Sequence, residues 1–157
     1  MFHDALVSFA ERRGITMLTL SATDVRKEWS SVVDGVVRNR PVLIKRTRDK
    51  IWLSDIETMA EILNAYQFTA ERFVEDDQTV TLSLNEIDLV ENAATEMEAR
   101  VILAQTIMEY AVEYYEHYAV YSKAPNRKAH IPYVFKALLA EDIQLLGESI
   151  LCRDGKN

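Results

Sequence analysis

The chain has little of several features that define whole classes of protein. Only one of its 157 residues is cysteine, Cys152, which excludes an intramolecular disulfide framework and favours a reducing compartment, so a cytoplasmic location is expected. Four glycines and three prolines are too few for a collagen-like or low-complexity chain. No apolar run approaches the roughly 18 residues of a membrane helix, so we expect no membrane partner.

Residues that carry chemistry are equally scarce. The sequence has no Gly-rich phosphate loop, no G-x-S-x-G elbow and no cysteine pair for a metal. Glu113 and the pair Glu116-His117 form one approximate Glu-x-x-His turn, whereas a di-metal site needs two from different helices. A solvated acidic helix face is the favoured interpretation. We therefore expect no catalytic residue, no metal site and no cofactor, and no enzymatic activity.

Charge is distributed unevenly along the chain. The formal net charge is -7, but residues 17–55 carry eight basic against five acidic side chains, a net of +3. Residues 56–157 carry eight basic against eighteen acidic side chains, a net of -10. A basic block followed by an acidic block indicates two modules with different partners. The acidic total argues against a wholly nucleic-acid-binding surface but permits one basic face.

The first 66 residues predict a helical extension followed by a strand, a helix, a hairpin and a second helix. Residues 1–16 place Phe2, Leu6 and Phe9 at helical spacing, and a strand follows at 18–20. Ser21 is a helix cap with Asp24 in the first turn. One helix face is then predicted from apolar residues at helical steps, namely Val25, Trp29, Val32, Val33, Val36 and Val37.

Pro41 ends this helix, because a residue before proline is pushed out of the helical region. A hairpin is predicted next, with strands at 42–44 and 51–53 around a polar turn. Ser54-Asp55 caps a further helix.

The order and spacing of these residues resemble the DNA-binding half of Phd/YefM antitoxins. The likeness rests on the helix start Ser21-Ala22 with Arg26, on the strand Pro-Val-Leu-Ile-Lys-Arg at 41–46 and on the hairpin return into Leu53-Ser54. The chain also resembles longer bacterial Phd-like proteins that carry a second, acidic module. The resemblance begins near Met17 and leaves residues 1–16 as an extension.

The resemblance implies a homodimer with a shared sheet whose flanks contact operator DNA. Members of this family have one basic residue early in the first helix and another at the end of the second strand. The matching residues here are Arg26 and Arg46. Lys27 and Arg48 lie beside them, within reach of phosphates. Guanidinium groups on a rigid helix start and hairpin suit bidentate contact with phosphate or guanine. The alternative is that all four are solvated surface cations.

The second module predicts two strands and a long helix. Residues 68–74 lead into an acidic turn, and Val80, Leu82 and Leu84 alternate along a strand at 79–84. A second strand is predicted from Ile87 to Asn92. Thr95 then caps a helix over residues 96–121, with Glu98 at the capping-box position.

This helix has a second apolar stripe, which includes Tyr110, Tyr114, Tyr118 and Tyr121. Tyrosines are good interface anchors, because each joins a large apolar body to a polar tip. They are therefore our candidate partner-binding residues. Packing against residues 131–146 of the same chain is the alternative that we place first. Two further helices are predicted after this helix. The first begins near Pro132, and the second covers residues 143–151. A frayed tail is predicted at 152–157.

The predicted fold class is α+β, with a Phd/YefM-like strand-helix-hairpin-helix dimerisation module followed by a small β-β-α module with C-terminal helices. The predicted domains are 1–16, 17–66 and 67–151, with the tail at 152–157. The resemblance implies an antitoxin that binds and neutralises a protein toxin, of the RelE-like ribonuclease type, and represses its own operon. Two alternatives stay open: a stand-alone dimeric scaffold and a solitary transcription regulator without a toxin.

Overall fold

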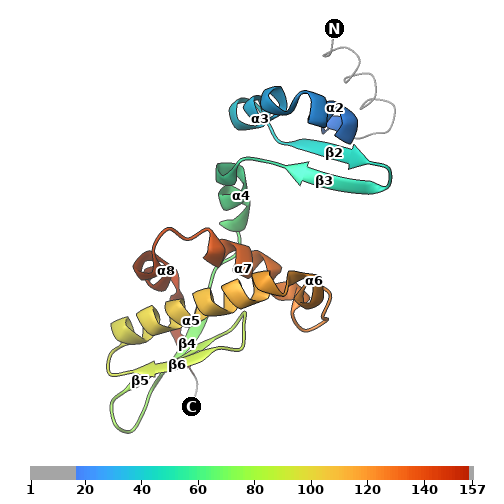
Figure 1. The fold of residues 1–157 in the computed structure, drawn as a ribbon. Helices are drawn as coiled ribbons and strands as arrows, with labels where there is room; N and C mark the ends of the chain where they lie inside the picture. Colours follow the sequence, from blue (N-terminus) through green and yellow to red (C-terminus); the bar gives the residue numbers. More distant parts are fainter. Residues whose placement is uncertain (1–16, 156–157) are drawn as a thin grey trace. The chain divides into compact units, whose positions relative to one another are not determined.

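The computed structural model describes residues 17–155 and confirms the α+β class (Figure 1). The chain divides into two compact units, with unit 1 ending at Met59 and unit 2 beginning at Ala60. The division falls inside a helix, a few residues before the predicted boundary at 66–67. The helix predicted for residues 1–16 lies outside the described residues.

Unit 1 contains a three-stranded sheet in the order β1-β2-β3. Its elements are β1 (Thr19–Ser21), α2 (Ala22–Lys27), α3 (Trp29–Arg38), β2 (Val42–Arg46), β3 (Asp49–Leu53) and the start of α4 (Ile56–Leu63). Strand β1 pairs parallel with β2, and helices α2 and α3 form the crossover that a parallel pair requires. Strands β2 and β3 form the predicted antiparallel hairpin.

Both predicted helix caps of unit 1 are present. The backbone N–H of Asp24 donates to Ser21 Oγ at 3.1 Å. The N–H of Thr58 donates to Asp55 Oδ1 at 3.0 Å, which begins α4. These bonds satisfy backbone donors that a helix start leaves free, so the local sequence determines where each helix begins.

The single helix predicted after Ser21 is wrong, because the structure divides it at Glu28. That residue has φ -113° and ψ 29°, outside helical geometry, and it ends α2. The break redirects α3, so only part of the predicted apolar stripe reaches the core. Val25 and Val36 are buried, whereas Trp29 and Val37 are 54% and 60% exposed.

Unit 2 contains a four-stranded sheet in the order β6-β5-β4-β7. Its elements are β4 (Thr69–Val74), β5 (Val80–Leu84), β6 (Val90–Ala93), α5 (Glu96–Glu116), α6 (Tyr118–Tyr121), the 3-10 helix η1 (Lys128–His130), α7 (Ile131–Leu138), α8 (Ile143–Ser149) and β7 (Leu151–Asp154). Helix α5 crosses one face of the sheet and packs against α7 and α8 (Figure 1). The largest fully buried side chains are Phe68, Leu82, Leu103, Ile107, Tyr114, Val134 and Ile150.

The local predictions for β5 and for the start of α5 are confirmed. Val80, Leu82 and Leu84 are buried on alternate positions of β5. Thr95 and Glu98 form both bonds of a capping box, each at 3.2 Å. The end of the long helix differs from the prediction, since α5 stops at Glu116 and a separate turn of helix follows His117.

The strand predicted from Ile87 begins only at Val90. Ile87 is nevertheless 3% exposed, because the bend at 85–89 turns its side chain into the core. Burial alone therefore does not make this residue part of a strand.

The predicted frayed tail is also wrong, since β7 pairs parallel with β4 from Leu151 to Asp154. Residues 69–74, which the sequence analysis left without an element, form β4. The predicted last helix correspondingly ends at Ser149, before this strand begins.

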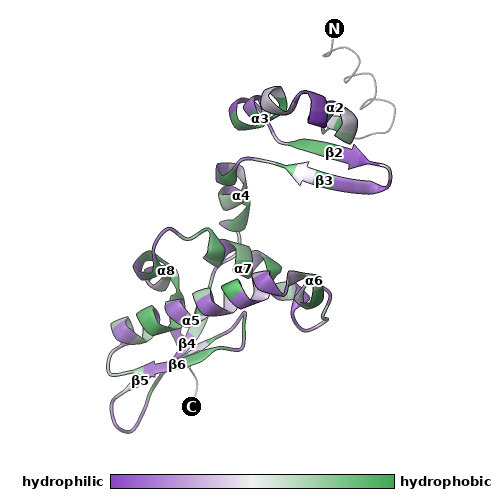
Figure 2. Cartoon of the chain, viewed as in Figure 1, coloured by the Kyte–Doolittle hydropathy of each residue, from purple (hydrophilic) through white to green (hydrophobic). Residues whose placement is uncertain are grey.

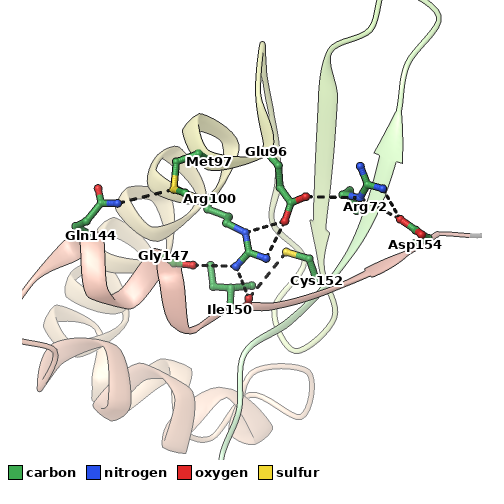
Figure 3. A network of polar contacts seen from close by, with 9 residues as sticks. All are labelled: Arg72, Glu96, Met97, Arg100, Gln144, Gly147, Ile150, Cys152 and Asp154. Atoms are coloured by element: carbon green, nitrogen blue, oxygen red, sulfur yellow. Dashed lines mark hydrogen bonds and ion pairs between the residues drawn. The ribbon is translucent and has the colours of Figure 1, made fainter.

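A polar network holds β7 in place (Figure 3). Arg72 binds Asp154 on β7 at 2.6 Å and lies 3.7 Å from Glu96. Arg100 binds Glu96 at 2.8 Å and donates to the Ile150 carbonyl at 2.6 Å. Two arginines therefore connect the start of α5 to the chain on either side of Leu151.

Candidate nucleic-acid interface and partner surface

Basic residues gather at one end of the unit 1 sheet. Because β1 and β2 are parallel, both end at the same edge, where Ser21 lies opposite Lys45. Helix α2 starts directly after Ser21, so Arg26 lies within about 7 Å of that edge along the helix axis. Arg46 ends β2, and Arg48 follows in the hairpin turn. The structure thus brings Arg46 and Arg48 together at this end, and it places Arg26 and Lys27 side by side in the last turn of the short helix α2.

These charges form no ion pairs within the part of the chain that the structure describes, although Asp49 lies opposite Arg46 in the hairpin register. Arg26, Lys27, Arg46 and Arg48 are all exposed. Across residues 17–155, none of the four side chains makes an ion pair or a hydrogen bond. Lys45 lies directly opposite Lys50 in the hairpin register, a like-charge pair that favours an added anion. Figure 2 shows β2 changing from hydrophobic to hydrophilic toward this turn.

The hairpin turn also contains an unusual backbone conformation. Thr47, between Arg46 and Arg48, has φ 52°. A β-branched residue in the left-handed region is rare, and such strain, of the order of 1–3 kcal/mol, concentrates at functional segments. The tight turn places the two arginines on either side of Thr47 at the tip of the hairpin.

The four candidate tyrosines of unit 2 do not share one environment. Tyr114 is 0% exposed, and its hydroxyl donates to the Arg127 carbonyl at 2.9 Å. The Tyr110 hydroxyl lies 2.6 Å from His130 Nδ1, and the Tyr121 hydroxyl donates to a Glu113 carboxylate at 2.7 Å. Packing within the chain, the alternative placed first, is therefore what the structure shows for these three. Tyr114 is not available to a partner in this conformation, whereas Tyr118 is 37% exposed.

Arg127 is at the centre of this tyrosine cluster. Its guanidinium carbon lies 3.9 Å from the centroid of the Tyr121 ring and 5.9 Å from that of Tyr110. The loop cation therefore binds aromatic faces. Burial raises the pKa values of Tyr110 and Tyr114, so both hydroxyls stay protonated and able to donate.

Sequence reasoning missed a second aromatic group on the outer side of α5. Tyr115 follows the buried Tyr114 in the sequence, yet it is 59% exposed. Its ring lies 6.5 Å from that of Phe135 on α7, and the Tyr118 ring lies 5.8 Å from the same phenylalanine. Only the position of α7 distinguishes this side of the helix from the sheet side, so the sequence alone offers no means of finding it.

Neither a metal centre nor a membrane span is found in the described part of the chain. No three His, Cys, Asp or Glu side chains in residues 17–155 come close enough to hold a metal ion. None of the helices described there combines the length and the apolar character needed to cross a bilayer.

Comparison with known proteins gives two matches. Residues 17–151 match the model of the family described as PHD_like, antitoxin of toxin-antitoxin, RelE / RelB, TA system. The crystal structure of an antitoxin part of a proposed toxin/antitoxin system from Syntrophomonas wolfei subsp. wolfei is similar, with a TM-score of 0.84 and 32% identity. The alignment covers 88% of this chain and 100% of that one. No curated protein matches the chain.

Proposed function

Because the chain belongs to the PHD-like family of toxin–antitoxin antitoxins, we propose that it neutralises a protein toxin and represses its own operon as a DNA-binding homodimer. The toxin is proposed to be a RelE-like ribonuclease, and the antitoxin to act in the cytoplasm without catalysing a reaction. The proposal assigns DNA to unit 1 and the toxin to unit 2.

The observation that carries the DNA-binding half is the basic end of unit 1, whose exposed cations form no ion pair within the described residues. Arg26, Arg46 and Arg48 are exposed, and Lys45 and Lys50 add two charges to the same hairpin. Clustered cations that form no ion pairs bind phosphates and release counterions, which gives a salt-dependent affinity. An exposed arginine at this end also suits bidentate contact with guanine.

Dimerisation is supported by how little unit 1 buries. Its core cluster holds four buried side chains, Val25, Val36, Val42 and Ile44. Trp29, Val37, Ile51 and Trp52 are each more than 40% exposed. A groove of about 760 Å³ runs beside β1, and its lining combines apolar side chains such as Leu18, Leu20 and Val32 with polar ones. A unit with so small a core needs further burial, which a second copy supplies.

Toxin binding is supported by the family and by the charge of unit 2. Residues 60–157 carry eight basic against seventeen acidic side chains, a net of -9. A field of this sign accelerates encounter with a basic protein and disfavours nucleic acid. The two units therefore suit partners of opposite charge.

The proposal is tested by fluorescence anisotropy on the DNA upstream of the chain's own gene, over a salt series. We expect specific binding well above that of random DNA. Arg26→Ala and Arg46→Ala should each lose about 1–3 kcal/mol if the arginine contacts a base, or reduce the salt slope by about one if it contacts a phosphate. Arg38→Ala is the matched control, since Arg38 ends α3 and lies 3.9 Å from Asp34.

The alternatives give distinct results in the same assay. A dimer that prefers no upstream DNA at low salt contradicts repression and favours a scaffold. Specific DNA binding with no affinity for the product of the adjacent gene favours a solitary regulator. Equal losses for Arg38→Ala and Arg46→Ala would mean that only total charge matters, which contradicts a defined basic end.

A further inference from the structure

We infer that the toxin is recognised by an aromatic patch on the outer side of α5, formed by Val112, Tyr115, Tyr118 and Phe135, which binds a basic segment bearing arginine and aliphatic side chains. The inference rests on the proposed function for the existence of the toxin. It assigns the surface and the chemistry of the segment that binds there.

The patch is exposed although it is built from large apolar side chains. Val112 and Tyr115 are 43% and 59% exposed, and Tyr118 is 37% exposed. The edge-to-face rings of Tyr115 and Tyr118 both contact Phe135, which joins α5, α6 and α7 into one continuous surface. Exposed aromatic groups held in fixed positions are typical anchors of protein interfaces, since little side-chain entropy is lost on binding.

Acidic side chains border one flank of this patch. With about 3.6 residues per turn, Glu109 and Glu116 fall on one side of Val112 and Tyr115 falls on the other. Both glutamates are exposed, and neither makes an ion pair with any residue that the structure describes. An apolar strip beside unpaired carboxylates suits a partner that is at once apolar and cationic.

The same unit already contains this recognition chemistry. Arg127 stacks 3.9 Å above the Tyr121 ring, while the Tyr121 hydroxyl binds the Glu113 carboxylate. A partner arginine on the patch would meet the same groups, a tyrosine face and a nearby glutamate. A basic protein segment therefore fits the surface better than an acidic or nucleic-acid ligand, which the net charge of -9 on unit 2 repels.

The test measures association and dissociation rates of the full-length chain with the protein encoded by the adjacent gene. Tyr115→Ala and Tyr118→Ala should each raise the dissociation rate at least about tenfold, because anchors determine residence time. The pair Glu109→Gln with Glu116→Gln should slow association several-fold and flatten its salt dependence, leaving dissociation nearly unchanged.

Tyr66→Ala is the matched control. The exposed fraction of Tyr66, 38%, is similar to that of Tyr118. Its ring, however, packs on Tyr133, which lies on the opposite side of α7 from Phe135. It should bind at the wild-type rates. Thermal unfolding of each variant separates lost contacts from lost folding.

Each result is decisive. Binding by the wild type with unchanged rates for all patch variants overturns the inference and leaves the toxin proposal intact. A loss in Tyr66→Ala as large as in Tyr115→Ala also overturns it, since the effect would not be specific to the patch. No binding by the wild type to the adjacent gene product contradicts the toxin proposal itself and the inference with it.

Discussion

Units 1 and 2 differ in how much of their apolar surface they bury within one chain. Unit 1 buries four core side chains and leaves Trp29 and Trp52 about half exposed. Unit 2 buries sixteen in its core cluster, including the whole of Phe68, Leu103 and Tyr114. Burial of apolar area is the main favourable contribution to folding, so we expect unit 2 to fold by itself and propose that unit 1 is stabilised by association.

The two units also contain separate spectroscopic probes. Both tryptophans of the chain, Trp29 and Trp52, lie in unit 1, whereas all seven tyrosines lie in unit 2. Tryptophan fluorescence therefore follows unit 1, and the circular dichroism of α5 follows mainly unit 2. A change in stability can therefore be assigned to unit 1 or to unit 2 by the probe that responds to it.

The largest expected effect comes from emptying the core of unit 2. Leu103→Ala should lower the free energy of unfolding by about 2–5 kcal/mol, since it removes a side chain with no exposed surface and leaves a cavity. Urea titration followed by circular dichroism measures it. The neighbouring Ile102→Ala, at a site 37% exposed, should change little. A matching shift of the tryptophan transition would show that the units do not unfold independently.

Dilution should distinguish the units next. If unit 1 is stable only as a dimer, each tenfold dilution lowers its apparent stability by about 1.4 kcal/mol. The tryptophan midpoint should then fall with concentration while the circular dichroism midpoint stays constant. A tryptophan midpoint independent of concentration contradicts the dependence of unit 1 on a second copy.

Helix caps provide a smaller and symmetrical comparison. Ser21 caps α2 in unit 1 and Thr95 caps α5 in unit 2, each accepting a backbone bond at 3.1–3.2 Å. Ser21→Ala and Thr95→Ala should each cost about 1 kcal/mol, because a backbone donor loses its partner. Each change should move only the probe of its own unit in a denaturant titration. A Thr95→Ala variant as stable as the wild type would contradict the importance of the capping box.

The smallest expected effect depends on pH. Burial, together with the charge of Arg127, lowers the pKa of His130, so the folded chain binds this proton less readily than the unfolded chain. The contribution of the neutral His130 to the free energy of unfolding is complete above the ordinary histidine pKa of about 6.5. It decreases as the pH falls below that value. Unit 2 should therefore lose more stability between pH 7 and pH 5 in the wild type than in His130→Gln. Unit 1 has no histidine in residues 17–59, and its tryptophan midpoint in the two proteins should not differ.

Local features of the fold were predictable from the sequence. The caps at Ser21, Asp55 and Thr95 depend on neighbouring residues only, and the alternation of Val80, Leu82 and Leu84 depends on one strand. Arg26 and Arg46 were identified through the family resemblance. The parallel pairing of β1 with β2, which brings the ends of both strands to one edge, was not predicted.

Features that depend on distant pairing were not predictable. Strand β7 exists because Leu151 pairs with Thr69 and because Arg72 binds Asp154, contacts between segments 82 residues apart in sequence. The residues of β7 alone, Leu-Cys-Arg-Asp, have no pattern that favours a strand. Tyr114 and Tyr115 are adjacent and chemically identical, and only the placement of the sheet and α7 makes one buried and the other exposed.

Hydrogen–deuterium exchange of the full-length chain, with and without its upstream promoter DNA, tests the central claim most directly. The claim is that DNA binds the basic end of unit 1 while the acidic unit 2 stays free for a protein partner. We predict slower exchange in α2 and in the β2–β3 hairpin, with unchanged exchange in α5 and in β4, β5, β6 and β7. Protection confined to unit 2, or none in the hairpin when the DNA is saturating, would contradict it.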